Sequence, residues 1–305
     1  MTGWERLMRI PCFALFLSLA AAAVARPEIA PPMRVAPKEQ WLSKTFAVEP
    51  LARYRLTFRA RVEGGLTRET SAEAEEAFYD VRRAQRGVLW PRWERRFFAS
   101  DGTRAKDWGI LYPYWNSVWS QEDHDFVDVF YAPPGAATLQ VVYANPGADA
   151  TLWASEPSLV REDGGAALNV NPDFALGRYC HAGYAMAGYG SSVQMLPKPE
   201  GGGFFLRVAT WCNMDPVPVM AGTRYRVALQ LRPDTFSGAR CTVTFEGDDG
   251  KPIKNSGGSV LAKMAAHGGE ETFRAPPGAT RMKMLIGAAD YVAIRVEAAG
   301  TEGTR

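Results

Sequence analysis

RYRLTFRAR (residues 53–61) is the stretch that decides the fold, because its polar and apolar side chains alternate with a period of two residues. The same pattern returns as RYRVALQLR (residues 224–232). Strict alternation is typical of a β-strand that packs one face on a core and turns the other to water. The sequence therefore predicts two such strands, one in each half of the chain.

Two further pairs of segments follow these strands in the same order. FFASDG (97–102) is echoed by TFEGDDG (244–250), where an aromatic strand end runs into an Asp-Gly turn. FYAPPGAATLQVV (130–142) is echoed by FRAPPGATRMKML (273–285). A single match would be weak, but three matches in one order indicate an internal duplication.

The first copy is longer than the second by about 23 residues between the first two of these landmarks. Much of the excess is TSAEAEEAFYDVRRAQRG (70–87), where Thr70 and Glu73 form a capping-box pattern. The apolar residues of this segment form one stripe at helical spacing. We expect one short helix inserted into an otherwise β-structured copy.

The remaining chain consists of short β-prone runs separated by Gly, Pro and Asp, without long helical periodicity. This pattern favours antiparallel sandwiches over a parallel α/β sheet. We therefore predict an all-β fold of two tandem antiparallel β-sandwich domains, residues 26–163 and 164–305, the first with a short helical insertion. The link between them is expected in the polar, glycine-containing stretch around residues 161–167.

The first 25 residues have the pattern of a secretory signal peptide. Arg6 and Arg9 precede an apolar stretch that ends at Ala23-Val24-Ala25, a small-x-small cleavage pattern. No later segment approaches the roughly 20 apolar residues that span a bilayer. The formal net charge of +2 gives no signal for nucleic-acid binding. We expect a secreted or periplasmic protein without membrane insertion and without a nucleic-acid partner.

Three cysteines follow the signal segment: Cys180, Cys212 and Cys241. An odd number allows at most one intrachain disulfide. Cys180 with Cys212 is the favoured pair, because both lie in aromatic, strand-like segments. The other two pairings and three buried thiols stay open as alternatives.

The order of these signals resembles the carbohydrate-binding modules with a galactose-binding-like jelly-roll fold that are attached to secreted polysaccharide-degrading enzymes. LNVNPDF (168–174) is similar to the opening strand of that family, and ADYVAIRVEA (289–298) is similar to a closing strand. The first half is similar from residue 46 to residue 160. The resemblance implies a jelly-roll fold and a glycan ligand. It also allows a structural calcium ion near Asp173 and Asp290, and no other cofactor.

WGILYPYWNSVW (108–119) holds five large aromatic rings, whereas the matching segment of the second copy, residues 251–269, has none. Core positions that the fold needs recur in both copies, so rings found in one copy are more often specialised. Indole and phenol rings suit the apolar face of a sugar, and an amide can bond its hydroxyls. The competing interpretation packs these rings in a core under the inserted helix. The site hypothesis is a ligand-binding surface made of Trp108, Tyr112, Tyr114, Trp115, Asn116 and Trp119.

A second aromatic set lies among glycines and comprises Tyr179, Tyr184 and Tyr189, with Trp211 farther on. Glycine neighbours indicate exposure at a loop or strand edge. Burial with satisfied hydroxyl groups is the favoured interpretation for the tyrosines.

An enzyme would need two carboxylates set roughly 5–10 Å apart across a glycosidic bond. Glu94, Asp107 and Glu122 are the candidates. The acidic run at 122–125 leads into the alternating FVDVFY, which favours a solvated strand entry. The three histidines lack metal-ligand spacing, and neither a nucleophile elbow nor a phosphate-cradling loop is present in the sequence. We expect neither catalysis nor a catalytic metal.

These patterns together favour a secreted, non-catalytic carbohydrate-binding protein that recognises a polysaccharide or oligosaccharide through exposed aromatic residues. The alternative is a structural or adhesion protein of the cell envelope that binds protein partners. That alternative predicts a broad exposed apolar patch rather than a groove.

Overall fold

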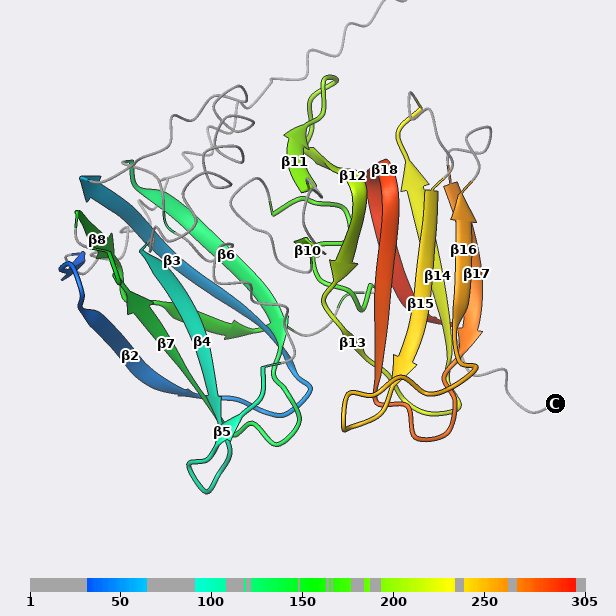
Figure 1. Ribbon diagram of the computed structural model, residues 1–305, viewed down its shortest axis with the longest axis horizontal. Coiled ribbons are helices and arrows are strands. Elements are labelled where there is room, and N and C mark those ends of the chain that lie inside the picture. The colour runs from blue at the N-terminus through cyan, green and yellow to red at the C-terminus, as the bar shows by residue number, and fades with distance from the viewer. Residues whose placement is uncertain are drawn as a thin grey trace, which may run out of the picture. The chain divides into compact units, whose positions relative to one another are not determined.

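The computed structural model describes residues 32–64, 91–107, 118, 122–147, 149–162, 165, 167–176, 184–186, 193–233, 239–262 and 268–299. Every regular element in these ranges is a β-strand, and the sheets are antiparallel. Strands β1 to β9 pair among themselves, as do strands β10 to β18 (Figure 1). The predicted all-β fold of two antiparallel β-sandwiches is confirmed. No helix within these ranges is long and apolar enough to cross a membrane.

The first half forms two sheets. One is five-stranded, in the order β1-β8-β3-β6 with β9 also alongside β3, and the other is four-stranded, in the order β2-β7-β4-β5. The strands are β1 (Met33–Val35), β2 (Gln40–Ala47), β3 (Arg53–Gly64), β4 (Arg92–Phe98), β5 (Arg104–Ala105), β6 (His124–Tyr131), β7 (Thr138–Ala144), β8 (Ala150–Ala154) and β9 (Ser158–Arg161).

The alternation of RYRLTFRAR is realised in β3. Its apolar residues are buried between the two sheets, and Leu56 is fully buried. Phe58 stacks on Phe126 with ring centroids 5.1 Å apart and meets Trp93 and Tyr143 edge-on at 5.4 and 5.2 Å. These rings come from strands of both sheets, so the aromatic contacts hold the two layers together.

The described residues of the second half contain nine strands that form one continuous hydrogen-bonded sheet. They are β10 (Tyr184–Met186), β11 (Val193–Pro197), β12 (Phe204–Met214), β13 (Val217–Pro218), β14 (Arg224–Leu231), β15 (Ala239–Glu246), β16 (Gly258–Ala262), β17 (Gly268–Arg274) and β18 (Arg281–Ala299).

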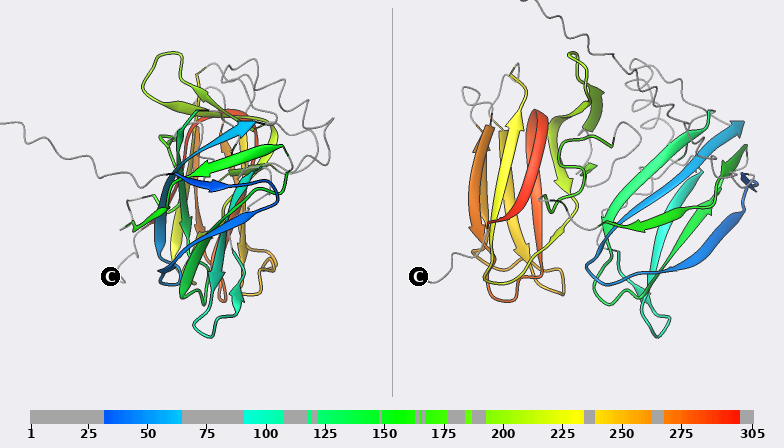
Figure 2. Two further views of the ribbon diagram at one scale, coloured as in Figure 1. Left: turned by 90° about the vertical axis from the view of Figure 1, so that its left-hand side faces the viewer. Right: turned by 180° about the vertical axis from the view of Figure 1, so that it is seen from behind.

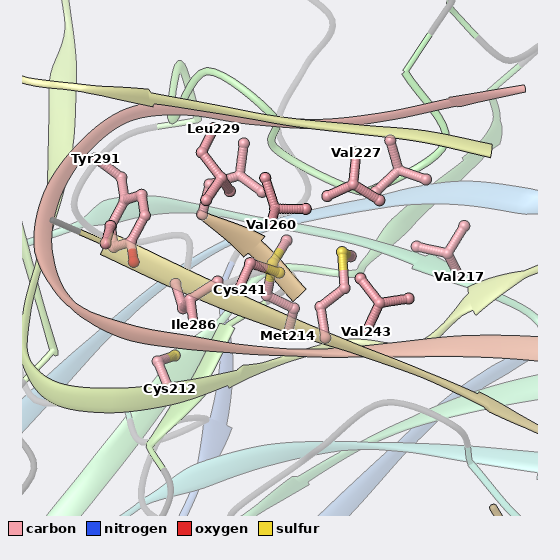
Figure 3. Packing of buried hydrophobic residues seen from close by; sticks show 14 of the residues in the cluster. Cys212, Met214, Val217, Val227, Leu229, Cys241, Val243, Val260, Ile286 and Tyr291 are labelled. Carbon is pink, nitrogen blue, oxygen red and sulfur yellow. The ribbon is translucent and has the colours of Figure 1, made fainter. Parts of the chain in front are cut away.

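The long strand β18 joins the two layers of the second sandwich. Residues 281–286 pair with β15 and residues 285–291 with β12, whereas residues 291–299 pair with β14. In Figure 3 the β18 ribbon curves around Tyr291, so that its two parts lie on opposite sides of the core. Figure 2 shows this strand in red from two further directions. The sheet therefore closes over its own apolar face.

The duplication is visible in matched hydrogen bonds. The Tyr54 hydroxyl accepts a bond from the backbone N–H of Glu49 at 2.8 Å, and the Tyr225 hydroxyl accepts one from Met220 at 2.7 Å. In both halves the donor lies five residues before the tyrosine. The Tyr of each RYR motif therefore fixes the turn that leads into its own strand.

The two predicted turns also recur with the same bonds. Asp101 accepts from the N–H of Thr103, and Asp249 accepts from the N–H of Lys251, both at 2.9 Å. After each Pro-Pro-Gly turn the next alanine, Ala136 or Ala279, donates to the first proline carbonyl at 3.1 Å. The three sequence matches thus mark equivalent places in two folded copies.

The segment LNVNPDF, expected as an opening strand, is not itself a strand but lies along β18. The Leu168 N–H donates to Val296 O at 2.7 Å, and the Asn169 side chain bonds Ile294 O and Val296 N at 2.7 and 2.8 Å. Asn171 and Phe174 have positive φ, which breaks extended pairing. The side-chain amide of Asn169 replaces the ladder bonds that a strand would form.

Cys212 and Cys241 both face the core, and each lies opposite Ile286 of β18 from one side (Figure 3). Two strand spacings separate them by about 10 Å, beyond the reach of a disulfide. The Cys212 thiol donates to Asn213 O at 3.3 Å. The favoured bridge from Cys212 to Cys180 stays a prediction, because its second cysteine is not described. Burial raises the pKa of Cys241 to about 12. Both sulfurs act as small core side chains, and Cys180 lies outside the described residues.

Several predictions about the chain's organisation fall outside the described residues: the signal peptide 1–25 and the inserted helix 70–87. The two large apolar clusters of the described residues come from different halves, one from residues 33–159 and the other from residues 168–296, and a small third cluster contains Val129 and Val170. The division between residues 163 and 164 falls on positions that are not described, and it stays a prediction.

Leu51 adopts a φ of 62° and Gly222, at the matched position of the second copy, a φ of 84°. An L side chain in this left-handed region is strained, and Leu51 is 44% exposed, so it contributes little packing. We expect Leu51→Gly to raise the free energy of unfolding by about 0.5–1 kcal/mol, measured by urea denaturation. The matched control, Gly222→Ala, should lower it by about 1 kcal/mol. A Leu51→Gly variant less stable than the parent would contradict the strain argument.

Candidate functional site

The predicted aromatic surface lies outside the described residues. This holds for each of its members: Trp108, Tyr112, Tyr114, Trp115, Asn116 and Trp119. Both interpretations of these rings, ligand platform and core, therefore remain open. What the structure does describe is how the chain leaves the first sandwich before this segment and returns after it.

Both ends of the aromatic segment are attached at β4. Asp107, the residue before Trp108, bonds the guanidinium of Arg95 at 3.1 Å. Val118 is fully buried, and its N–H donates to Pro91 O at 2.8 Å, one residue before β4 begins. Residues 108–117 are therefore held at both ends by one strand of the four-stranded sheet.

Arg95 is an arginine inside a sandwich core. It lies on the inward side of β4 between Trp93 and Phe97, and its side chain is 1% exposed. The guanidinium bonds Asp128 of β6 at 2.8 Å and lies 4.4 Å from the centroid of the Phe130 ring. It thus links the two sheets and reaches Asp107 at the rim of the core.

Burial and charge act in opposite directions on this ion pair. Burial is the largest influence on Asp128 and raises its pKa to about 6, although Arg95 works to lower it. Burial also disfavours the charged form of Arg95, but attraction to Asp107 and Asp128 outweighs it and raises the Arg95 pKa. The guanidinium therefore stays charged while Asp128 takes up a proton in mildly acidic solution.

Glu94 and Asp107, two of the carboxylates considered for glycoside hydrolysis, are both bonded to arginines of β4. Glu94 accepts bonds from Arg92 and Arg96 on the outward side of β4, each at 3.2 Å. Asp107 binds Arg95, whose side chain leaves the opposite, inward side of the same strand. These two carboxylates thus lie on different sides of β4.

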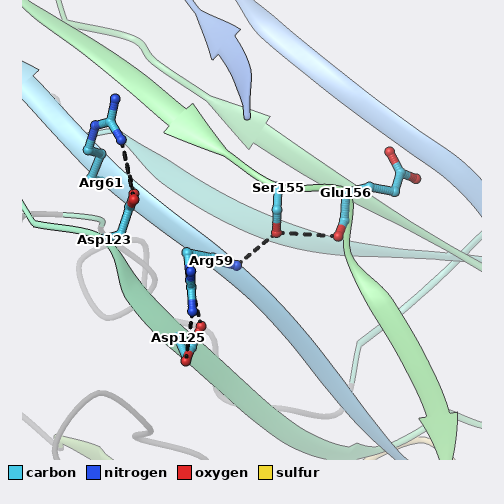
Figure 4. A network of polar contacts seen from close by, with 6 residues as sticks. All are labelled: Arg59, Arg61, Asp123, Asp125, Ser155 and Glu156. Atoms are coloured by element: carbon cyan, nitrogen blue, oxygen red, sulfur yellow. Dashed lines mark hydrogen bonds and ion pairs between the residues drawn. The ribbon is translucent and has the colours of Figure 1, made fainter. Parts of the chain in front are cut away.

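The acidic run before β6 is a solvated strand entry, as the sequence favoured. Asp125 pairs with Arg59 at 3.0 Å and Asp123 with Arg61 at 3.3 Å, on the outward side of β3 and β6 (Figure 4). Glu122 directly precedes this pair of bridges. Exposed ion pairs of this kind contribute little to stability. Here they place the arginines of β3 beside the aspartates at the start of β6.

The residues to which the resemblance assigned calcium have protein partners. Both Asp290 oxygens accept bonds from Arg207, at 2.9 and 2.8 Å, and Asp173 accepts from the Ala175 N–H at 3.3 Å. Calcium takes six to eight oxygen ligands. Among the described residues no group of three or more His, Cys, Asp or Glu side chains is placed to hold a metal ion.

The structure points to another aromatic residue, Trp211 of β12. Between Val208 and Trp211 the pairing with β18 shifts by one residue, which is a β-bulge. After the bulge Cys212 points into the core, and Trp211 points outward with 40% of its surface exposed. The sequence analysis placed Trp211 in the second aromatic set, for whose tyrosines burial was favoured. The bulge that exposes Trp211 has no signature in the sequence.

Trp211 heads a row of outward positions that crosses four strands. Gly287 of β18 lies opposite it, Arg240 of β15 is next to Gly287, and Leu261 of β16 is opposite Arg240. Leu261 is 62% exposed. The row therefore presents an indole ring, a position without a side chain, a cation and an exposed apolar group.

The next outward row adds hydrogen-bonding groups. It consists of Asn213, Leu285, Thr242 and Ser259, from the same four strands. Leu285 is 36% exposed. We name these eight residues the Trp211 face. A flat ring beside amide, hydroxyl and guanidinium groups has the composition of a surface that binds polar, ring-shaped ligands. Of the tyrosines in the second set, Tyr179 and Tyr189 lie outside the described residues.

The chain is similar to three solved structures at low sequence identity. The N-terminal CBM22-1-CBM22-2 tandem domain from Paenibacillus barcinonensis Xyn10C is 11% identical, with a TM-score of 0.31 over 88% of this chain and 87% of that one. The M60 catalytic domain with the CBM51-1 and CBM51-2 domains from Clostridium perfringens ZmpB is 7% identical, with a TM-score of 0.22 over 88% of this chain and 34% of that one. PBSX exported protein XepA is 9% identical, with a TM-score of 0.24 over 89% of this chain and 85% of that one.

No protein-family model matches the chain, and no curated protein matches it in sequence. Similarities at these TM-scores carry no argument about ligands. The class that the fold defines, a tandem β-sandwich protein, rests on the strand pairing described above.

The raised pKa of Asp128 predicts a pH-dependent stability. The folded chain holds a proton with a pKa of about 6 where the unfolded chain has 3.8, so this contribution is full below pH 3.8 and is lost as the pH rises through about 6. Asp128→Asn removes the titration. As the pH rises from about 4 to about 7, the free energy of unfolding of the parent should fall relative to that of the variant by at most about 3 kcal/mol, as measured by urea denaturation. Parallel pH profiles would show that Asp128 is charged throughout.

Proposed function

We propose that the protein is a secreted, non-catalytic carbohydrate-binding protein that holds glycan on exposed aromatic residues. The observation that carries this proposal is Trp211, an indole ring with 40% of its surface exposed on an open sheet face. An exposed indole offers a flat apolar surface that can stack on the apolar face of a pyranose ring.

The groups around Trp211 support a sugar ligand. Asn213 offers an amide on β12 itself, and Thr242 and Ser259 offer hydroxyl groups two and three strands away from the ring. Glycan recognition combines a ring platform with a small number of placed polar groups. The open sheet face suits a polymer chain, because a chain needs no closed pocket.

The aromatic segment 108–119 belongs to the proposal as a second binding surface. Asp107, which precedes the segment, is bonded to Arg95, and Val118, within the segment, is bonded to Pro91. Attachment at both ends limits the conformational entropy that such a segment loses when it binds. Two surfaces on one chain would increase avidity for a long polymer.

A non-catalytic role is supported by the pairing of carboxylates with arginines. Glu94, Asp107, Asp123 and Asp125 each contact at least one guanidinium. The alternative role, binding a protein partner in the cell envelope, is favoured by Leu261 and Leu285, which add exposed apolar area beside Trp211.

The test is binding of the purified secreted chain to a glycan array and to insoluble polysaccharides. We expect Trp211→Ala to weaken binding by at least about tenfold, because it removes the stacking platform. The matched control is Trp153→Ala, since Trp153 is a surface indole held by Glu63 on the first sandwich. A Trp108, Trp115 and Trp119 triple alanine variant tests the second surface.

Far-ultraviolet circular dichroism and thermal unfolding confirm that each variant is folded. If the parent binds none of the polysaccharides, the glycan proposal fails and the protein-partner role takes its place. If Trp153→Ala loses as much binding as Trp211→Ala, the Trp211 face is not the site.

A further inference from the structure

Three cations lie on the outward side of β12, β18 and β15, and they have different partners. Arg207 pairs with Asp290 at 2.8 Å, and Lys283 pairs with Glu246 at 3.1 Å. Arg240 donates instead to the hydroxyl of Ser259, from Nε at 3.0 Å and from Nη2 at 2.9 Å. Across the part of the chain that the structure describes, Arg240 forms no ion pair, and its guanidinium is bonded to a neutral hydroxyl.

The first copy has an arginine at the same place with a carboxylate beside it. Arg92 pairs with Ala144 of β7, just as Arg240 lies beside Gly287 of β18. Two residues later, Glu94 pairs with Val142 of β7, and its counterpart Thr242 pairs with Leu285 of β18. Arg92 bonds Glu94 at 3.2 Å. The second copy has Thr242 where the first copy has Glu94, so Arg240 lacks the acidic neighbour that Arg92 has.

The matched outward faces differ in two further ways. In the first copy Gln40 pairs with Ala144, whereas at the matched place of the second copy Trp211 pairs with Gly287. Val142 has no exposed surface, whereas its counterpart Leu285 is 36% exposed. The indole, the uncompensated cation and the open surface therefore occur together in one copy only.

The spacing of these groups fits a sugar unit that carries an acidic substituent. Trp211 and Arg240 lie on strands either side of β18, about 10 Å apart at two strand spacings. Gly287 lies between them and places no side chain above the sheet. A pyranose ring stacked on the indole can extend a carboxylate over this gap to the guanidinium.

We propose that the Trp211 face selects acidic polysaccharides, with Arg240 binding the carboxylate of a uronic acid unit. The inference rests on the proposed glycan-binding function and names its ligand class. Arginine binds carboxylates through two parallel N–H groups, and such charge-assisted bonds are about twice as strong as neutral ones. Ser259 holds the guanidinium in place in the absence of ligand, which lowers the entropy lost on binding.

The experiment compares each acidic polymer with its own neutral form. Polygalacturonate, alginate and hyaluronan are tested beside their carboxyl-reduced derivatives, by calorimetry or affinity electrophoresis, at low and at physiological salt. The variants are Arg240→Gln, Arg240→Lys and the control Arg92→Gln, which removes the matched but paired arginine of the first copy.

We expect the parent to prefer at least one acidic polymer over its reduced form, with affinity that falls as salt rises. Arg240→Gln should lower affinity for that polymer by about tenfold and change affinity for the reduced form by less than about twofold. Arg240→Lys should retain part of the preference, and Arg92→Gln should retain all of it.

Two results would overturn the inference while glycan binding stands: equal affinity of the parent for each polymer and its reduced form, or an Arg240→Gln variant that binds the acidic polymer like the parent. Failure of the parent to bind any polymer, acidic or neutral, would overturn the proposed function and this inference with it. The two failures are therefore distinguishable in one set of measurements.

Discussion

The alternation of buried and outward-facing side chains along β3 and β14 is the constraint on which both cores are built. It fixes Leu56 and Phe58 in one core and Val227 and Leu229 in the other. Because the core side must fill a defined space, its residues recur in kind between copies. The outward side has no such requirement, so the copies can diverge there without loss of the fold.

This division explains which features the sequence could predict. The alternation of RYRLTFRAR, the Asp-Gly turns and the Pro-Pro-Gly turns are local, and each recurs as the same hydrogen bonds in two places. Local chemistry therefore identified the duplication and the all-β class. LNVNPDF was expected to be a strand but is held along β18 by the side chain of Asn169, a substitution for ladder bonds that propensity does not reveal.

The Trp211 face could not be read in the same way, because it is built from register between distant strands. Trp211, Arg240 and Leu285 are neighbours only once β12, β15 and β18 are aligned, and the bulge before Trp211 decides which side the ring takes. A shift of one residue would have sent the indole into the core. One of the alternative cysteine pairings is excluded for a related reason, since Cys212 and Cys241 share a row but have Ile286 between them.

The same comparison of copies gives meaning to the buried Arg95. Val243 stands at the matched position of the second sandwich, where it pairs with Met284 as Arg95 pairs with Val141, so an apolar side chain takes the place of the arginine. A buried ion pair is often no more stabilising than well-packed apolar residues of similar volume, so the fold does not require an arginine there. What Arg95 adds is a bond to Asp107, the residue that begins the one aromatic segment the second copy lacks. The first sandwich thus places a charge in its core at the point where its unshared segment is attached.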